Sequence, residues 1–124
     1  MFRAVMLALF AFPAIADDRA AFYGAWGTAD QCSGAPIKSG GTVRAQPFEI
    51  GPDWIRQGET FCSLEWFPVE ALENELFTGA QARCGEDTVI GYTLGMRLSD
   101  DALMLRWDFL TSNGPLSRCA GSTQ

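Results

Sequence analysis

The stretch TVIGYTLGMRLSDDALMLRWDF, residues 88–109, decides the fold class of this chain. Its apolar residues fall at alternate positions on both sides of Ser99-Asp100-Asp101, a group of turn-forming residues. A period of two is typical of strands that bury one face. The stretch therefore predicts an antiparallel hairpin of strands 88–98 and 102–109.

The apolar faces of these strands fix their register, because a slip of one residue would turn the apolar set toward water. The predicted cross-strand pairs are Leu98 with Leu103, Met96 with Leu105, Leu94 with Trp107, and Tyr92 with Phe109. On the outer face, the same register brings Thr93 opposite Asp108. Gly91 and Gly95, also on that face, indicate the strong curvature that a closing barrel needs.

Outside this hairpin, short strand-like segments alternate with turn residues. About seven or eight short strands joined by sequential turns predict an all-β fold, either a small antiparallel barrel or a sandwich. The segment 68–76 differs, because Val69, Leu72 and Leu76 have helical spacing after Pro68. It predicts one short helix that caps an end of the sheet. We expect residues 17–124 to form a single β domain.

The first sixteen residues have the pattern of a secretory signal peptide. Arg3 precedes an apolar run over Ala4–Phe12, and Ala14-Ile15-Ala16 matches the small-x-small site of a signal peptidase. The apolar run is too short to span a bilayer. We therefore expect cleavage after residue 16 and a periplasmic or secreted protein. No cysteine follows the cleavage site, so no lipid anchor is expected.

The chain has four cysteines, at positions 32, 62, 84 and 119. In an oxidising compartment they predict two disulfides, with three pairings possible. We favour Cys62–Cys84, on neighbouring predicted strands, and Cys32–Cys119, which would tie the first strand region to the last. Cys32–Cys62 with Cys84–Cys119 remains open. There is no CxxC pair and no close ligand spacing, so neither a redox pair nor a metal site is expected.

The charge balance argues against two classes of binding partner, nucleic acid and anionic lipid. The chain has 9 Lys+Arg against 15 Asp+Glu, a formal net charge of −6, without a basic cluster. Binding to nucleic acid needs a basic stripe, and docking on anionic lipid needs the same. We expect neither of these partners and no membrane span. The sequence leaves the oligomeric state open.

Catalytic chemistry finds little support in the composition. The chain has no histidine, which removes the commonest general base and metal ligand. The remaining catalytic candidates are carboxylates such as Glu65 and Asp108, at outward strand positions, and nothing predicts that they converge. We expect no enzyme and no cofactor, with a carboxylate-dependent hydrolase as the third hypothesis.

The tryptophans supply the binding candidates. Trp66 and Trp107 lie on apolar faces and are expected in the core. Trp26 and Trp54 lie beside glycine or turn residues, so we expect partial exposure. With Phe48 they would line the mouth of a barrel and bind an apolar ligand or a partner loop. The alternative is that these rings fill the ends of the barrel.

Gly24-Ala25-Trp26, at the start of the first strand, resembles the Gly-x-Trp that opens lipocalin-like barrels. With Cys32 following soon after, the chain resembles the bacterial periplasmic inhibitors of secreted metalloproteases, which are eight-stranded barrels. The resemblance implies that an N-terminal arm, Asp17-Asp18-Arg19-Ala20, enters the active site of a protease.

Our leading hypothesis is an exported, non-enzymatic binding protein of the periplasm. Its partner would be an exported hydrolase, which it would inhibit, or a small apolar ligand. The alternative is a structural or interaction module of the cell envelope.

Overall fold

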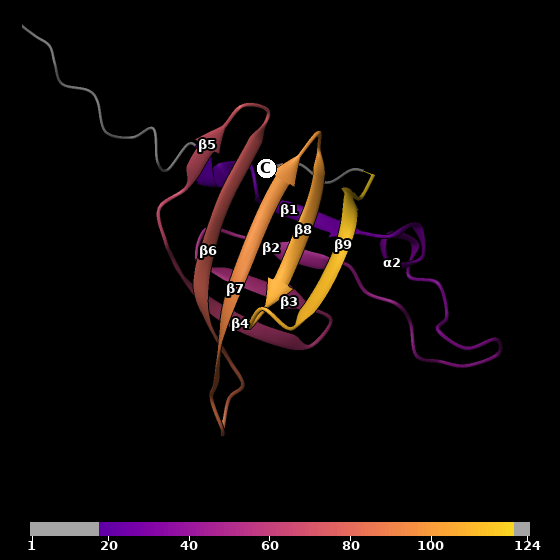
Figure 1. The fold of residues 1–124 in the computed structure, drawn as a ribbon. Coiled ribbons are helices and arrows are strands. Elements are labelled where there is room, and N and C mark those ends of the chain that lie inside the picture. The colour runs from indigo at the N-terminus through magenta and orange to yellow at the C-terminus, as the bar shows by residue number, and fades with distance from the viewer. Residues whose placement is uncertain (1–17, 121–124) are drawn as a thin grey trace, which may run out of the picture.

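Antiparallel strands form nearly all of the regular structure in the computed structural model, which describes residues 18–120 (Figure 1). The strands are β1 (Gly24–Gly27), β2 (Phe48–Ile50), β3 (Trp54–Gln57), β4 (Thr60–Trp66), β5 (Glu70–Leu72), β6 (Glu75–Cys84), β7 (Ile90–Ser99), β8 (Ala102–Trp107) and β9 (Thr111–Arg118). They pair in the order β4-β3-β2-β1-β9-β8-β7-β6-β5, and a further pairing of β4 with β6 closes the ring. The result is a closed eight-stranded barrel, with β5 added outside it. The all-β prediction is confirmed, and the barrel replaces the sandwich.

The predicted helix over residues 68–76 is wrong. Glu70–Leu72 forms β5, which turns back at once and pairs with the start of β6. Asn74 makes this tight turn with a left-handed backbone at φ 67°, which a continuing helix cannot contain. Leu72 is 56% exposed, so the helical spacing of its apolar neighbours did not mark a buried face.

The short helix α2 (Ala29–Ser33) was not predicted by the sequence analysis. Thr28 caps its start: the Thr28 hydroxyl accepts from the Gln31 backbone N–H, and the Gln31 side chain accepts from the Thr28 N–H. This reciprocal capping box satisfies two otherwise unpaired donors and stabilises a helix of only five residues.

The predicted hairpin is β7 and β8, and three of its four cross-strand pairs are confirmed. Leu98, Met96 and Leu94 lie opposite their predicted partners. The fourth pair, Tyr92 with Phe109, is wrong, because β8 ends at Trp107. Asp108 and Phe109 have left-handed backbones, at φ 50° and 60°, which turn the chain out of the strand.

The expected approach of Thr93 and Asp108 is confirmed. The Asp108 N–H donates to the Thr93 carbonyl at 2.7 Å, and the Thr93 N–H donates to Asp108 Oδ1 at 2.7 Å. Phe109, expected on the buried face, is instead 66% exposed. The hairpin therefore ends in a turn that places an aromatic ring outside the barrel.

Side chains fill the interior of the barrel. The largest fully buried ones are Trp26, Phe22, Ile55, Leu94, Leu103 and Leu105. Alternation along β7 and β8 sends Leu94, Leu103 and Leu105 inward and their sequence neighbours outward. The barrel is therefore a packed core, and the outer faces of its strands carry the groups available to partners.

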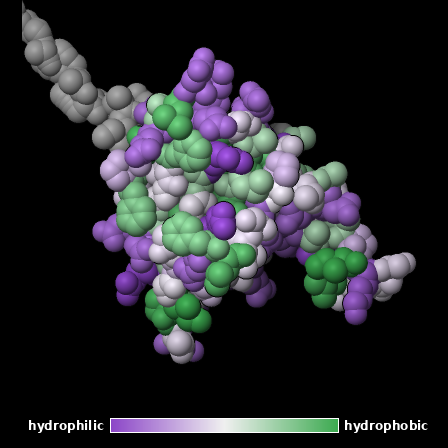
Figure 2. Space-filling view, viewed as in Figure 1, coloured by the Kyte–Doolittle hydropathy of each residue, from purple (hydrophilic) through white to green (hydrophobic). Residues whose placement is uncertain are grey.

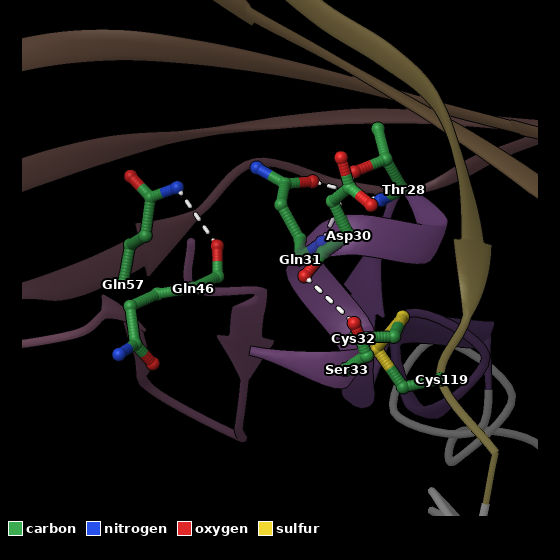
Figure 3. The surroundings of a disulfide bond; sticks show 8 residues. All are labelled: Thr28, Asp30, Gln31, Cys32, Ser33, Gln46, Gln57 and Cys119. Atoms are coloured by element: carbon green, nitrogen blue, oxygen red, sulfur yellow. Dashed lines mark hydrogen bonds between the residues drawn. A yellow bond between two sulfur atoms is a disulfide. The ribbon is translucent and has the colours of Figure 1, made fainter. Parts of the chain in front are cut away.

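Both favoured disulfides are confirmed. Cys62 and Cys84 are direct cross-strand partners in the pairing of β4 with β6 that closes the barrel. Cys32–Cys119 joins α2 to the residue that follows β9, as Figure 3 shows, and spans 87 positions of sequence. A disulfide of either kind contributes about 2–4 kcal/mol, chiefly by restricting the unfolded chain.

Candidate functional site

Rows of outward side chains cross β6, β7 and β8, the strands that lie at the front of Figure 1. The cross-strand rows are Phe77, Arg97 and Met104; then Gly79, Gly95 and Arg106; then Gln81 and Thr93. The middle row carries two neighbouring glycines between rows of larger side chains. This outer face therefore has a depression that runs across the strands, which we call the glycine trough. Its floor is Gly79 and Gly95, and its walls are Phe67, Phe77, Phe109, Arg97, Met104 and Arg106.

The two floor glycines are in different surroundings. A Cβ atom at Gly79 would lie 3.2 Å from Cδ2 of Phe67 and 3.0 Å from the carbonyl oxygen of Leu94, so the Phe67 ring already covers this glycine. At Gly95 the nearest neighbour of such an atom would be the Arg106 carbonyl oxygen, at 3.8 Å, an ordinary contact. The backbone of Gly95 is not left-handed either. Neither space nor backbone conformation requires glycine at position 95.

Phenylalanines surround this open floor. Phe67 is 43% exposed and Phe109 is 66% exposed, while Phe77 is partly buried. Phe109 reaches the trough because of the left-handed turn after β8, and the Arg106 guanidinium donates to its carbonyl oxygen at 3.2 Å. Two adjoining hollows of about 310 and 420 Å³ share the side chains of Phe77 and Phe109. Figure 2, which views this face, shows hydrophobic groups gathered around a centre that also carries hydrophilic ones.

The trough has a positive end. Arg97 and Arg106 occupy diagonal positions on β7 and β8, where long side chains reach one another. Within residues 18–120, the one ion pair joins Arg56 to Glu49, which lie on β3 and β2. The two trough arginines therefore have no carboxylate partner in that part of the chain, although the protein as a whole is acidic. Glu70 lines the opposite end, beside Phe67.

Trp26 does not have the predicted exposure. Its ring is fully buried, its indole N–H donates to the Phe22 carbonyl at 2.9 Å, and the Arg118 guanidinium lies 4.2 Å from the ring centroid. Its cross-strand partner on β2 is Phe48, and side chains of directly paired residues lie on the same face of the sheet, here the inner one. Phe48 is buried as well. The alternative, that such rings fill the barrel, is correct for Trp26.

Trp54 is half-buried on the outer face of β3, so its predicted partial exposure is confirmed. Its ring stacks on Phe61 at 6.2 Å between centroids, and the Arg56 guanidinium lies 5.6 Å from the ring centroid. Trp26 points inward and Trp54 outward, so the two tryptophans do not form one site. Neither of them lines the glycine trough.

The N-terminal arm is only partly described, because Asp17 lies outside residues 18–120. Asp18 lies in a helical turn, and its carbonyl accepts from the Ala21 N–H at 3.2 Å. Arg19 lies over the Trp66 ring at 5.7 Å, and Arg118 donates to the Ala21 carbonyl at 2.7 Å. The described part of the arm therefore lies against the barrel.

The carboxylates of the hydrolase hypothesis do not converge. Glu65 pairs with Gln81, Gln81 with Thr93, and Thr93 bonds to Asp108, so three strand intervals separate the two acids. At about 4.8 Å per interval, this is about 14 Å along the sheet. The acids of a glycosidase lie about 5–9 Å apart. Within residues 18–120 there is also no cluster of three potential metal ligands among His, Cys, Asp and Glu.

A small hollow reaches the core at one end of the barrel. It is lined in part by Phe48, Ile55, Cys62 and Trp107, and measures about 70 Å³. Pockets for small ligands commonly measure about 300–1,000 Å³. This hollow is therefore too small for the apolar cargo of a carrier.

No family model matches the chain, and neither the curated proteins nor the solved structures contain a match. No helix in residues 18–120 is long and apolar enough to cross a membrane.

Sequence reasoning missed the trough. The available signal was the pair of outward glycines at 91 and 95, which we interpreted as curvature. Placing Phe67 beside Gly79, and Gly79 beside Gly95, requires the register of β6 against its neighbours, which the sequence analysis did not assign.

Proposed function

We propose that this chain is an exported, non-enzymatic binding protein that captures a partner protein through the glycine trough. An exported hydrolase is the partner class we favour, which would make the protein an inhibitor. Export is supported by the signal-like pattern of Met1–Ala16 and by the two disulfides, which persist in oxidising compartments.

The observation that carries the proposal is the open floor at Gly95. Glycine within a strand costs about 0.5–1 kcal/mol relative to alanine, and this position has room for a side chain. Such a glycine is typical of a site that another backbone or ligand approaches closely. Exposed Phe67 and Phe109 beside it supply apolar contact area.

Site-specific photo-crosslinking in the producing cells tests this function. Benzoylphenylalanine is placed at Phe109, beside the trough, or at Phe61, which is 52% exposed on the outer face of β4. We expect a discrete adduct from position 109, none from position 61, and loss of the adduct when Gly95→Ile fills the floor. Equal adducts from both positions, or an adduct that survives Gly95→Ile, would contradict the proposal.

The identity of the adduct separates the two candidate functions. An adduct with an exported hydrolase supports an inhibitor if the purified protein also abolishes the activity of that hydrolase in stoichiometric amounts. An adduct with an envelope component, without enzyme inhibition, supports the structural or interaction module.

Export is tested on protein recovered from cell fractions. We expect mass spectrometry to find a chain that begins at Asp17 in the periplasm or medium, without free thiols. Recovery from the cytosol with four free thiols would contradict the location.

A further inference from the structure

We infer that the glycine trough binds an extended segment of a partner protein in which apolar residues end in an aspartate or glutamate at one side. Its carboxylate would lie between Arg97 and Arg106. This inference rests on the proposed function and adds the chemistry of the partner.

The dimensions of the trough favour an extended segment. Phe67, Gly79, Gly95 and Arg106 follow one another across the sheet, from hydrogen-bonded neighbour to neighbour. Three strand intervals span about 14 Å, the length of about four residues at 3.3 Å each. Small-molecule sites bury 70–90% of their ligand, whereas this trough is an open depression on an outer face. A partner chain, which contacts the surrounding surface too, suits that shape better.

The apolar part of the segment follows from the walls. Phe67 and Phe77 flank the covered glycine, and Phe109 stands beside the open one at Gly95. Each ring is at least partly exposed and gains by burial under apolar side chains. Because these rings lie along most of the trough, the apolar residues of the partner would occupy that length.

The acidic end follows from the charges. Three arginines elsewhere in the described chain have partners inside the protein: Arg56 pairs with Glu49, and Arg19 and Arg118 lie over tryptophan rings. Arg106 donates to the neutral Phe109 carbonyl, so the positive charges of Arg97 and Arg106 stand together without a carboxylate in residues 18–120. Arginine forks bind carboxylates in strong, charge-assisted hydrogen bonds. Glu70 at the other end would repel an acidic group. The charges therefore place the acidic end of the segment at Arg97 and Arg106.

Two matched peptides test the inference against the whole mature protein labelled with nitrogen-15. The probes are acetyl-Leu-Phe-Leu-Asp-amide and the same peptide with Asn in place of Asp. We expect the Asp peptide to shift the amide signals of Gly79 and Gly95, and the Asn peptide to bind about tenfold more weakly, since a charged hydrogen bond is lost.

The double variant Arg97→Gln/Arg106→Gln should remove the preference, so that both peptides bind equally. Arg44→Gln is the matched control, because Arg44 is exposed on the loop between α2 and β2, and it should keep the preference. Circular dichroism confirms that each variant is folded. Equal binding of the two peptides to the unmodified protein, no binding of either, or shifts confined to residues outside the trough would overturn the inference.

Two further arms address other occupants. Laurate that shifts the same glycine signals where the Asp peptide does not would identify a lipid-like amphiphile and overturn the inference. Shifts of these glycine signals with protein concentration alone would identify a second copy of the chain as the occupant. They would also overturn the inference. A crosslink at position 109 together with failed peptides refutes this inference and leaves the proposed function standing, whereas absence of the crosslink refutes the function.

Discussion

The outer face of β6–β8 and the outer face of β2–β4 both carry aromatic, arginine and glycine residues, but within residues 18–120 only the β2–β4 face joins them in an ion pair and an aromatic stack. On the β2–β4 face, Arg56 pairs with Glu49 and lies over Trp54, which stacks on Phe61. A Cβ atom at Gly51 there would overlap the Trp54 indole.

On the trough face, Gly95 is open, Phe109 is exposed, and Arg97 has no carboxylate partner in residues 18–120. Aromatic, arginine and glycine residues therefore do not define a binding surface by themselves. What distinguishes the two faces is whether these groups already satisfy one another.

The largest expected difference between the faces is in the cost of removing an aromatic ring. Trp54→Ala should lower the free energy of unfolding by about 3 kcal/mol, because it removes buried area and an aromatic stack. Phe109→Ala should change it by less than about 0.5 kcal/mol, as for other exposed positions. Urea denaturation followed by tryptophan fluorescence measures both. Similar costs for the two variants would remove the contrast between the faces.

The second-largest difference concerns the effect of substituting alanine for a glycine on each face. Gly51→Ala should destabilise the protein by about 2 kcal/mol, because the new methyl group has no space beside the Trp54 ring. In a Trp54→Ala background most of that cost should disappear, since the overlapping ring is gone. A double-mutant cycle measured by urea denaturation gives this coupling. If Gly51→Ala remains destabilising without the Trp54 ring, the destabilisation comes from the backbone of the turn.

Gly95→Ala should have the opposite sign. We expect the free energy of unfolding to rise by about 0.5–1 kcal/mol, because alanine loses less backbone entropy and finds room here. Gly79→Ala serves as the control and should destabilise, since Phe67 and the Leu94 carbonyl lie close. Thermal unfolding monitored by circular dichroism compares the two. Destabilisation by Gly95→Ala would mean that the fold itself needs this glycine.

The smallest difference concerns the arginines. Arg56→Gln should cost less than about 1 kcal/mol, as is usual for an exposed ion pair, and the cost should fall as salt is added. Arg97→Gln should cost nothing measurable at any salt concentration, because it breaks no ion pair in residues 18–120. Unfolding titrations at low and high salt test this. A salt-dependent loss for Arg97→Gln would reveal an intramolecular partner.

Much of the barrel could be predicted from local pattern. The β7–β8 register follows from alternation over two adjacent strands with a short turn, so few arrangements bury both apolar faces. The Cys62–Cys84 pairing follows because its strands are close in sequence, with 22 positions between the cysteines. Both inferences depend on short-range relations that the sequence displays directly.

Other features depend on context that alternation does not contain. The left-handed backbones of Asp108 and Phe109 end the strand although the alternation continues. Trp26 has a glycine neighbour in sequence, yet it is buried because it lies on the inner face of β1, opposite buried Phe48. The capping box of α2 was legible at Thr28 and Gln31, but five residues gave no periodicity to support it.

The candidate site was the least predictable part. Its residues come from the chain just after β4, from β6, β7 and β8, and from the turn after β8. They meet only because these four strands are neighbours in the barrel. Moreover, its deciding properties are the room at Gly95 and, within residues 18–120, the lack of a carboxylate beside Arg97 and Arg106, and both depend on the positions of all neighbours. The outward position of Gly95 was predicted, but its open surroundings were not.

The adjacency of β1 and β9 makes this barrel suitable for circular permutation. Cys119 donates its N–H to the Ala25 carbonyl at 2.9 Å, so the end of β9 lies beside the start of β1, and a peptide linker could connect the chain after β9 to the segment before β1. New termini could then be opened in the exposed loop near Gly40, between α2 and β2. Such a rearranged polypeptide would keep β6–β8 in unbroken order, and so carry the trough intact on a chain that begins elsewhere.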